Sequence, residues 1–387
     1  MKRVSSIDFV RGLVMVIMAI DHVRDLMHLT GTTQDPTDLA TTYPALFFTR
    51  WITHLCAPTF VFLAGTSAYL SVKNQGNLTE SRQFLQKRGL WLIFLELTVI
   101  TLALWGDIGF HTFMFQVISA IGFGFIILSF LLKLSTRTIG IIGLVIVFGH
   151  NLVPLIPFSD NSIAKMVLSP LFAFTITPIT PHTSLLINYP IIPWLGIMLT
   201  GFACGQIFQL AAAERKAILL KMGLGALALF TLIRTTNFYG DPVHWAQQKD
   251  ALFTFMSFIN LTKYPPSLLY TLATLGISCL ILSFTEGVDN RFTRILSVYG
   301  KVPLFYYLAH WYIIRTLTFA MVFLQGFHWS DLEFGTFKFG LPKTGSGVEL
   351  WAVYVIWFGI VLVLYPLCKW YGQYKAEHKD NVWLRYL

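Results

Sequence analysis

The sequence predicts an all-α protein, a polytopic transmembrane helix bundle of about ten spans with both termini in the cytoplasm. Charged residues make up 12 % of the 387 residues and apolar residues make up 55 %, with a mean hydropathy of +0.64. Soluble domains carry roughly 25 % charged residues, so a soluble fold cannot hide this much apolar surface. Long uncharged runs recur, as at 351–367, and several approach the roughly 20 residues that cross a bilayer.

The apolar runs are long enough to predict individual helices. Hydropathy places them at 9–28, 46–71, 89–105, 113–132, 138–156, 191–211, 217–235, 266–285, 302–325 and 349–371. The first run could be mistaken for a secretory signal, but Asp8, Arg11 and Asp21 interrupt it and no small-residue cleavage pattern follows. We expect a retained helix. Since no repeat or linker divides the chain, a single integral membrane domain over residues 1–387 is expected.

The loop charges predict an orientation. Most loop Lys and Arg residues lie on the side of the amino terminus, and the opposite loops hold only Lys165, Lys249, Lys263, Lys338 and Lys343. The positive-inside rule therefore places both termini in the cytoplasm and the long loops 157–190 and 236–265 outside, as ordered lids over the bundle. The net charge of +9 is spread over short clusters and forms no basic face. We expect membrane lipid as a partner and no nucleic acid.

The cysteine and glycine patterns limit the other options. Cys56, Cys204, Cys279 and Cys368 lie within or at the ends of apolar runs, without a C-x-x-C pair, so neither a disulfide framework nor a metal site is expected. The pair Gly201-x-x-x-Gly205 has the spacing that lets membrane helices approach closely. It offers one possible contact in a homodimer.

The first helix carries an ionisable cluster near its outer end. Asp21, Arg24, Asp25 and His28 stand at i, i+3, i+4 and i+7, which gathers them on one helical face. Counted from the start of the run, His22 lies roughly 20 Å along the helix and His28 roughly 28 Å. Intramembrane ionisable residues are usually functional or paired. Asp21 beside His22 favours a general base oriented by a carboxylate, whereas the structural alternative is an Asp/Arg network that fixes the helix end.

Two further helices carry histidines. In the second helix Arg50 and His54 stand one turn apart, and Pro58 leaves the carbonyl of residue 54 without its usual helical donor, so we expect a deformed, polar spot facing a cavity. In the ninth helix Tyr306 and His310 stand at i and i+4, and His310 lies roughly 10 Å along the helix, near mid-membrane. Each histidine has a structural alternative, namely a hydrogen bond to a neighbouring hydroxyl group.

Five sequence blocks form a recognisable pattern along the chain. They are RVSSIDFVRG at 3–12 leading into MAIDH at 18–22, APTFVFLAG at 57–65, YPIIPWLG at 189–196, TKYPPS at 262–267 and GKVPLFYY at 300–307. Together they resemble a bacterial branch of one family of membrane enzymes, the heparan-alpha-glucosaminide N-acetyltransferase-like family. The resemblance implies a multi-pass acyltransferase of the cytoplasmic (inner) membrane. Acetyl-CoA or another acyl-CoA is its donor substrate, and the acyl group passes to an amine or hydroxyl of an extracytoplasmic glycan or amine acceptor.

The resemblance also suggests roles for individual residues. Candidates for the CoA site are Arg3, Asp8 and Arg11, with Arg88 and Lys301 as further cations that could meet the CoA phosphates. Arg50 and Lys263 are candidates for oxyanion stabilisation, and Tyr264 and Tyr306 for substrate contacts. The animal enzyme has Asn where this sequence has His22, and its catalytic His has a spacing that matches neither His28 nor His54. We therefore prefer His22 with Asp21 as the base, with His28, His54 and His310 as candidates that replace or orient it.

Two other functions compete with acyl transfer. A proton-coupled transporter of a small solute would use the same ionisable residues as a relay. It predicts polar groups in both membrane halves and an inverted repeat, whereas here the charges gather towards the outer side and no repeat is visible. A structural subunit would use the polar residues only to bond helices together, and single substitutions would then leave cellular function unchanged.

Overall fold

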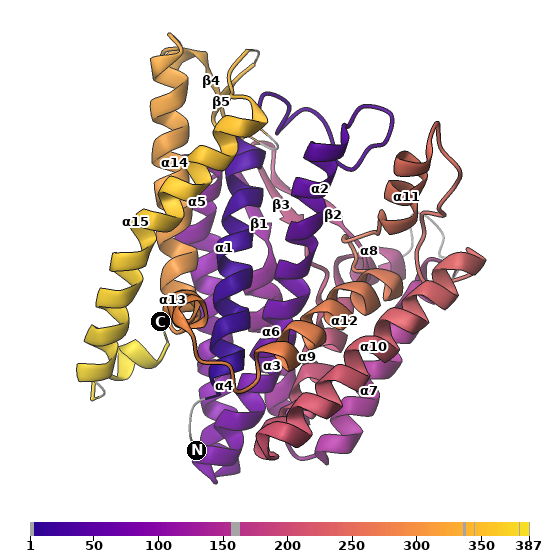
Figure 1. The fold of residues 1–387 in the computed structure, drawn as a ribbon. Coiled ribbons are helices and arrows are strands. Elements are labelled where there is room, and N and C mark those ends of the chain that lie inside the picture. The colour runs from indigo at the N-terminus through magenta and orange to yellow at the C-terminus, as the bar shows by residue number, and fades with distance from the viewer. Residues whose placement is uncertain (1–3, 156–162, 336–337, 344, 379, 387) are drawn as a thin grey trace.

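The computed structural model describes residues 4–155, 163–335, 338–343, 345–378 and 380–386. It is an all-α helix bundle with a few short strands at one end (Figure 1). The helices within the described residues are α1 (Ser5–Met27), α2 (Pro44–Ile52), α3 (Cys56–Gln75), α4 (Leu78–Leu95), α5 (Thr101–Trp105), α6 (Val117–Leu131), α7 (Thr136–Gly149), α8 (Ile163–Phe172), α9 (Ile191–Cys204), α10 (Ala212–Thr236), α11 (Ala251–Ile259), α12 (Leu268–Thr285), α13 (Arg291–Gly300), α14 (Pro303–Leu324) and α15 (Leu350–Glu377).

Each of the ten predicted spans is helical over most of its length, which confirms the fold class. Among the described residues, eight helical segments are long and apolar enough to cross a membrane. The two other predicted spans are α1, which carries the charged cluster, and α6, which has 15 residues. The count of ten spans and the cytoplasmic placement of the termini stay predictions. We call the end of the bundle where α1 begins the N-end, at the bottom of Figure 1, and the opposite end the far end.

The predicted deformation at Pro58 is present. The segment Thr53–Leu55 forms a 3-10 turn between α2 and α3, and the proline follows two residues into α3. The carbonyl oxygen of His54 instead accepts a hydrogen bond of 2.8 Å from the Tyr270 hydroxyl group on α12. The freed carbonyl is thus satisfied by a neighbouring helix, as expected for non-helical backbone at membrane depth.

Glycines bring two helix pairs into backbone contact. A Cβ atom built on Gly12 of α1 would lie 1.9 Å from the carbonyl oxygen of Leu296 on α13, and one on Gly300 would lie 1.8 Å from the carbonyl oxygen of Asp8. No side chain fits at these distances. This contact fixes α13 against the first half of α1 and places Lys301 close to Arg11, whose Nη1 donates to the Gly300 carbonyl oxygen at 3.3 Å.

A second glycine contact joins α3 and α9. A Cβ atom on Gly201 would lie 2.1 Å from the carbonyl oxygen of Phe62, and one on Gly205 would meet the ring of Tyr69. The suggestion that Gly201 and Gly205 form a contact between two copies is therefore wrong, because both residues are buried against α3 of the same chain. Whether the protein forms a homodimer stays a prediction.

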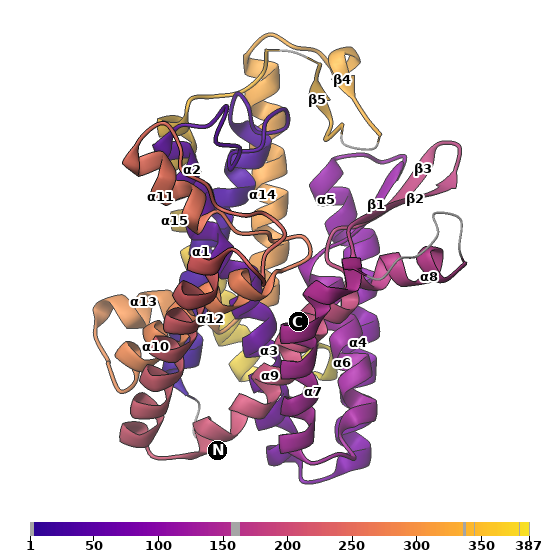
Figure 2. The same ribbon diagram turned by 90° about the vertical axis from the view of Figure 1, so that its right-hand side faces the viewer.

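Short strands appear where the sequence predicted helix and loop. The predicted helix at 113–132 begins later, because Thr112–Phe115 forms strand β1. It pairs in parallel with β3 (Thr183–Ile187), which pairs antiparallel with β2 (Thr175–Thr180). The predicted outer loop 157–190 contains β2, β3 and α8, which lie together in Figure 2. A two-stranded pair, β4 (Leu332–Glu333) and β5 (Leu341–Pro342), lies at the far end.

A buried arginine organises the second predicted outer loop. Arg234, near the end of α10, is 1 % exposed. Its guanidinium donates to the carbonyl oxygens of Val243, Ser257, Phe258 and Asn260, at distances between 2.7 and 3.0 Å. Four acceptors on one planar fork hold the segment around α11 in a fixed path beside α10.

Candidate active site

A histidine pair joins the first and fourteenth helices. Nδ1 of His22 on α1 lies 2.7 Å from Nε2 of His310 on α14, although the two residues are 288 positions apart in the chain. The indole of Trp311 stacks on the His22 ring, with centroids 4.0 Å apart and planes at 20°. His310 is fully buried and His22 is half-buried. Imidazole groups can act as general acids or bases near neutral pH, so this pair is a candidate for proton transfer.

The hydrogen-bond partners define the tautomers of the neutral pair. Nδ1 of His310 lies 2.5 Å from the carbonyl oxygen of Tyr307 and 3.2 Å from that of Tyr306. Carbonyl oxygens only accept, so this nitrogen carries the hydrogen and Nε2 of His310 accepts. His22 therefore donates from its own Nδ1, and its Nε2 holds the lone pair. In this arrangement Nε2 of His22 can accept a proton, and His310 orients the His22 ring.

His22 lines a small cavity of about 30 Å³ that we call the histidine chamber. The other lining groups with polar atoms are Asp21, Thr53, Cys56, Gln116, Tyr189, Lys263 and Tyr307. Nζ of Lys263 lies 5.0 Å from the ring centroid of Tyr264 and 6.0 Å from that of Tyr189. A base and a cation thus face one enclosed space.

Asp21 pairs with two arginines. Its carboxylate accepts from Arg24 at 2.8 Å and from Arg50 at 3.3 Å, and Arg24 also bonds Asp25. The expected carboxylate–imidazole hydrogen bond is replaced, because His22 bonds His310 and Asp21 bonds guanidinium groups. The structural alternative, an Asp/Arg network at this helix end, is present beside the chamber. The charged residues that line the chamber itself are Asp21, whose carboxylate is paired with the two arginines, and Lys263.

A cavity of about 320 Å³ reaches from the N-end to the chamber, and we call it the N-end cavity. Its charged lining residues are Arg11, Arg88, Lys301 and Lys375, and most of its other walls are apolar. Nε of Arg88 has no hydrogen-bond partner among the described residues. Three residues line both this cavity and the histidine chamber, namely Phe60, Val117 and Tyr307. The N-end cavity therefore adjoins the chamber that contains His22.

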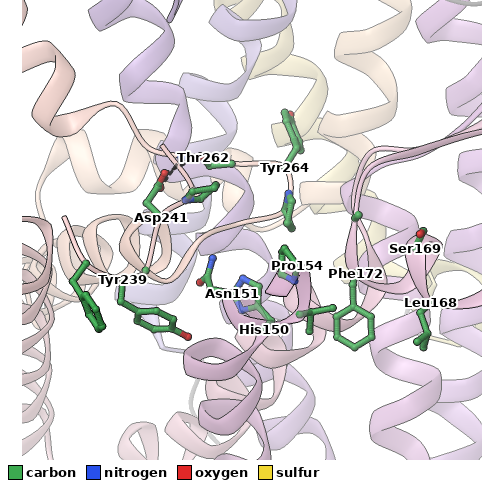
Figure 3. Close-up of a pocket in the computed structure, with 16 residues that line it drawn as sticks. His150, Asn151, Pro154, Leu168, Ser169, Phe172, Tyr239, Asp241, Thr262 and Tyr264 are labelled. Atoms are coloured by element: carbon green, nitrogen blue, oxygen red, sulfur yellow. Dashed lines mark hydrogen bonds between the residues drawn. The ribbon is translucent and has the colours of Figure 1, made fainter. Parts of the chain in front are cut away.

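A larger cavity of about 760 Å³ is lined in part by Tyr264, the residue after Lys263. Its walls also include Phe172, Phe238 and Tyr239, so we call it the aromatic cavity (Figure 3). The ring centroid of Tyr264 lies 5.4 Å from that of Tyr189, which lines the histidine chamber. This ring contact joins one wall of the aromatic cavity to one wall of the chamber.

The structure brings some of the predicted residues together. Asp21, His22 and Lys263 line the chamber, His310 supports His22, and Arg50 reaches Asp21 and, at 2.9 Å, the hydroxyl group of Thr53. At the predicted CoA side, Arg11 lines the N-end cavity and lies 3.5 Å from Asp8. Arg3 lies outside the described residues.

Other predicted residues lie apart from the chamber. Nδ1 of His28 contacts the Thr30 hydroxyl group at 3.1 Å, beyond the end of α1. His54 packs edge-on against Tyr270 and lines none of the three cavities. Tyr306 is fully buried between His310 and Tyr299. Its neighbour Tyr307 is the tyrosine that faces the cavities.

Sequence reasoning missed several lining residues. Gln116, Tyr189 and Tyr307 line the chamber, and Ser67 lines the N-end cavity, where it accepts from Arg11 at 2.8 Å. Tyr189 and Tyr307 lie inside blocks that resemble the family, which was the available signal. Gln116 had none, because it lies in the predicted helix at 113–132, whereas the structure places it between β1 and α6.

The fold and the site define a class: a multi-pass membrane protein with a histidine pair in a small chamber beside a cationic cavity. The family model described as "Heparan-alpha-glucosaminide N-acetyltransferase, catalytic" matches residues 3–237, which is about three-fifths of the chain. The chain belongs to this family, as the resemblance implied, and the family supports a membrane acetyltransferase. A comparison with curated proteins finds no match. The matched part contains His22, whereas Lys263, His310 and Lys301 lie beyond it.

Proposed function

We propose that the protein transfers an acetyl group from acetyl-CoA, bound in the N-end cavity, to an acceptor that enters from the opposite side, with His22 as general base. The observation that carries this proposal is the shared wall of Phe60, Val117 and Tyr307, which places the cationic cavity and the histidine chamber next to each other. A thioester bound in the N-end cavity can then place its carbonyl carbon close to His22 in the chamber.

The N-end cavity suits a CoA thioester. Its four cations match the phosphates of CoA, which Arg and Lys bind through charge-assisted hydrogen bonds. Arg11 and His22 are both on α1, and eleven residues of helix rise by about 16 Å. A pantetheine arm is a thin, flexible chain of comparable length. Its amides and apolar methylenes fit a mostly apolar passage with a few hydroxyl groups, such as that of Ser67.

The chemistry follows from the tautomers. Nε2 of His22 takes the proton of the acceptor, whose oxygen or nitrogen forms a bond to the thioester carbonyl carbon. The resulting oxyanion faces Lys263, the cation that lines the chamber. When the carbon–sulfur bond breaks, the CoA sulfur leaves as a thiolate and takes the proton from His22. His310 supports the transient imidazolium, because its Nε2 accepts the hydrogen on Nδ1 of His22.

The chamber volume favours the acetyl group. Its 30 Å³ corresponds to the space for one or a few water molecules, since one water needs about 10–15 Å³ of such volume. Acetyl is the smallest common acyl group. We place the N-end in the cytoplasm, where acetyl-CoA is available, and the aromatic cavity on the extracytoplasmic side of a bacterial inner membrane, in agreement with the positive-inside rule.

The donor half of the proposal is testable alone. Titration calorimetry of the purified full chain in detergent, with acetyl-CoA as the probe, should give saturable binding that free CoA displaces. In liposomes that contain the protein, the labelled acetyl group of acetyl-CoA should be transferred to an acceptor, and labelled acetyl-CoA should not accumulate inside. If the protein does not bind acetyl-CoA but accumulates a solute in response to a proton gradient, the transporter function is correct and acetyl transfer is wrong.

A further inference from the structure

The aromatic cavity differs from the N-end cavity because no Lys or Arg is among its described lining residues, and from this difference we infer the chemical class of the acceptor. We propose that the acceptor is an uncharged, polyhydroxylated ring, such as a neutral sugar unit, that enters through the aromatic cavity and is acetylated on a hydroxyl group. This inference rests on the proposed function, and it deepens that function because it selects an O-ester over an amide and a neutral ring over an anionic one.

The walls of the aromatic cavity carry no cation. Among its described lining residues there is neither Lys nor Arg, and the polar area is small beside the faces of Phe172, Tyr239 and Tyr264. A sulfated or carboxylated sugar needs a cationic partner once it leaves water. His150 is the lining residue that can gain a proton; its Nδ1 lies 3.0 Å from the carbonyl oxygen of Ile146, and its buried Nε2 has no hydrogen-bond partner among the described residues. An anionic ring would therefore meet one imidazole in the described part of this wall and neither a Lys nor an Arg.

The carboxylate in the wall is already saturated. Oδ1 of Asp241 accepts from the backbone nitrogen of Val243 and the hydroxyl group of Thr262, both at 2.9 Å. Oδ2 accepts from the backbone nitrogen of Thr262 at 2.9 Å and from the Ser267 hydroxyl group at 2.6 Å. A carboxylate has about four acceptor positions, so four donors use its full capacity. Asp241 fixes the loop before α12, as Figure 3 shows for Thr262, and does not bind an ammonium group.

The chamber itself also disfavours an ammonium group. Lys263 lines it, and the Asp21 carboxylate is held by Arg24 and Arg50. A protonated amine approaching His22 would meet a like charge in a site of low dielectric constant, where such repulsion is strong. A hydroxyl group carries no charge before it reaches the base. Aromatic faces beside a few hydrogen-bonding groups also suit the apolar faces and hydroxyl edges of a sugar ring.

Three matched sugars test the acceptor class. The full chain in detergent is given radiolabelled acetyl-CoA with methyl glucoside, methyl glucosaminide or methyl glucuronide, at a pH below the pKa of the amine. We expect an O-acetyl product from methyl glucoside, formed about tenfold faster or more than either charged analogue gives, a difference of about 1.4 kcal/mol. Preference for the glucosaminide or the glucuronide overturns the inference.

A blocking variant tests the route. Ala173, which lines the aromatic cavity, is replaced by Trp, and Ala213, exposed on α10, is replaced by Trp as a control of equal size. A173W should reduce acetylation of methyl glucoside more than tenfold and leave the affinity for acetyl-CoA unchanged, whereas A213W should change neither. Undiminished transfer in A173W overturns the route. Acetyl-CoA binding without acetylation of any of the three sugars overturns the acceptor class alone, whereas absence of acetyl-CoA binding in the unsubstituted protein defeats the proposed function.

Discussion

The N-end cavity and the aromatic cavity of this protein differ in charge. The N-end cavity is lined by Arg11, Arg88, Lys301 and Lys375, whereas the aromatic cavity has neither Lys nor Arg among its described lining residues. The N-end cavity shares lining residues with the chamber that contains His22, and Tyr264 of the aromatic cavity contacts Tyr189, which lines that chamber. The difference teaches how one chamber can take two substrates in a fixed orientation: an anionic donor is attracted to one mouth only, and a neutral acceptor has no competitor at the other.

The largest expected effect on this contrast comes from removing the imidazole of His22 in the chamber. His22→Gln should lower the rate of acetyl transfer by about 10²–10⁴-fold, the usual contribution of a general base. Acetyl-CoA affinity should stay within about twofold, because Arg11, one of the binding cations, lies about 16 Å from His22 along α1, and the other cations of the N-end cavity do not line the chamber. Initial rates with radiolabelled acetyl-CoA measure the effect. His28→Gln is the matched control, since His28 lies outside the chamber. A fully active H22Q protein would remove His22 from the mechanism.

A second test concerns the ion pairs that Asp21 forms beside the chamber. Asp21→Asn should destabilise the protein by about 3–5 kcal/mol, because it leaves two buried guanidinium groups, those of Arg24 and Arg50, without their shared carboxylate. Thermal unfolding in detergent measures the loss. The control is Asp38→Asn in an exposed loop, which should leave the melting temperature nearly unchanged. Equal melting temperatures for the two variants would contradict the role given to Asp21.

A third test of the charge difference between the two cavities removes one cation from the N-end cavity. Arg88→Gln should raise KM for acetyl-CoA by about 10–100-fold, as expected when a charged hydrogen bond of about 1.5–3 kcal/mol is lost. KM for the acceptor should not change. Steady-state kinetics with each substrate varied in turn separates the two, and Arg137→Gln, an exposed arginine at the start of α7, is the control. A rise in KM for the acceptor alone would place the donor elsewhere.

The smallest expected effect concerns the size of the chamber. Met18→Ala removes a side chain that lines the chamber on α1, and the added space should raise the ratio of propionyl to acetyl transfer several-fold, because one methylene is worth about 1–3 kcal/mol in a fitted pocket. Competition between the two thioesters in one reaction gives the ratio directly. An unchanged ratio would mean that the acyl group is held outside this space.

Much of the fold was predictable because the physics is local. The bilayer sets the length of each apolar run, and a 3.6-residue repeat places Asp21, Arg24 and Asp25 on one face, where the structure indeed joins them. The free carbonyl at residue 54 followed from the proline four residues later, since proline has no N–H to donate. Its acceptance of the Tyr270 hydroxyl group is a tertiary contact that the sequence does not specify.

The site was less predictable because its contacts are long-range. His22 and His310 were both candidates, but their pairing depends on how α1 and α14 cross, 288 residues apart. The sequence favoured Tyr306 through its i, i+4 relation to His310, whereas the rotation of α14 turns Tyr307 to the cavities and buries Tyr306. The strand β1 was missed because its apolar residues continue directly into α6, and periodicity alone does not separate a short strand from the start of a helix.

The backbone contact between α1 and α13 also constrains how this sequence can diverge. Gly12 and Gly300 leave no room for a Cβ atom, so even the smallest side chain at either position would push the two helices apart. Such a shift would separate Arg11 from Lys301, which line the same cavity from the two sides of this contact. Relatives that keep this donor site should therefore retain glycine at both positions, even while the aromatic walls at the other mouth change with the acceptor.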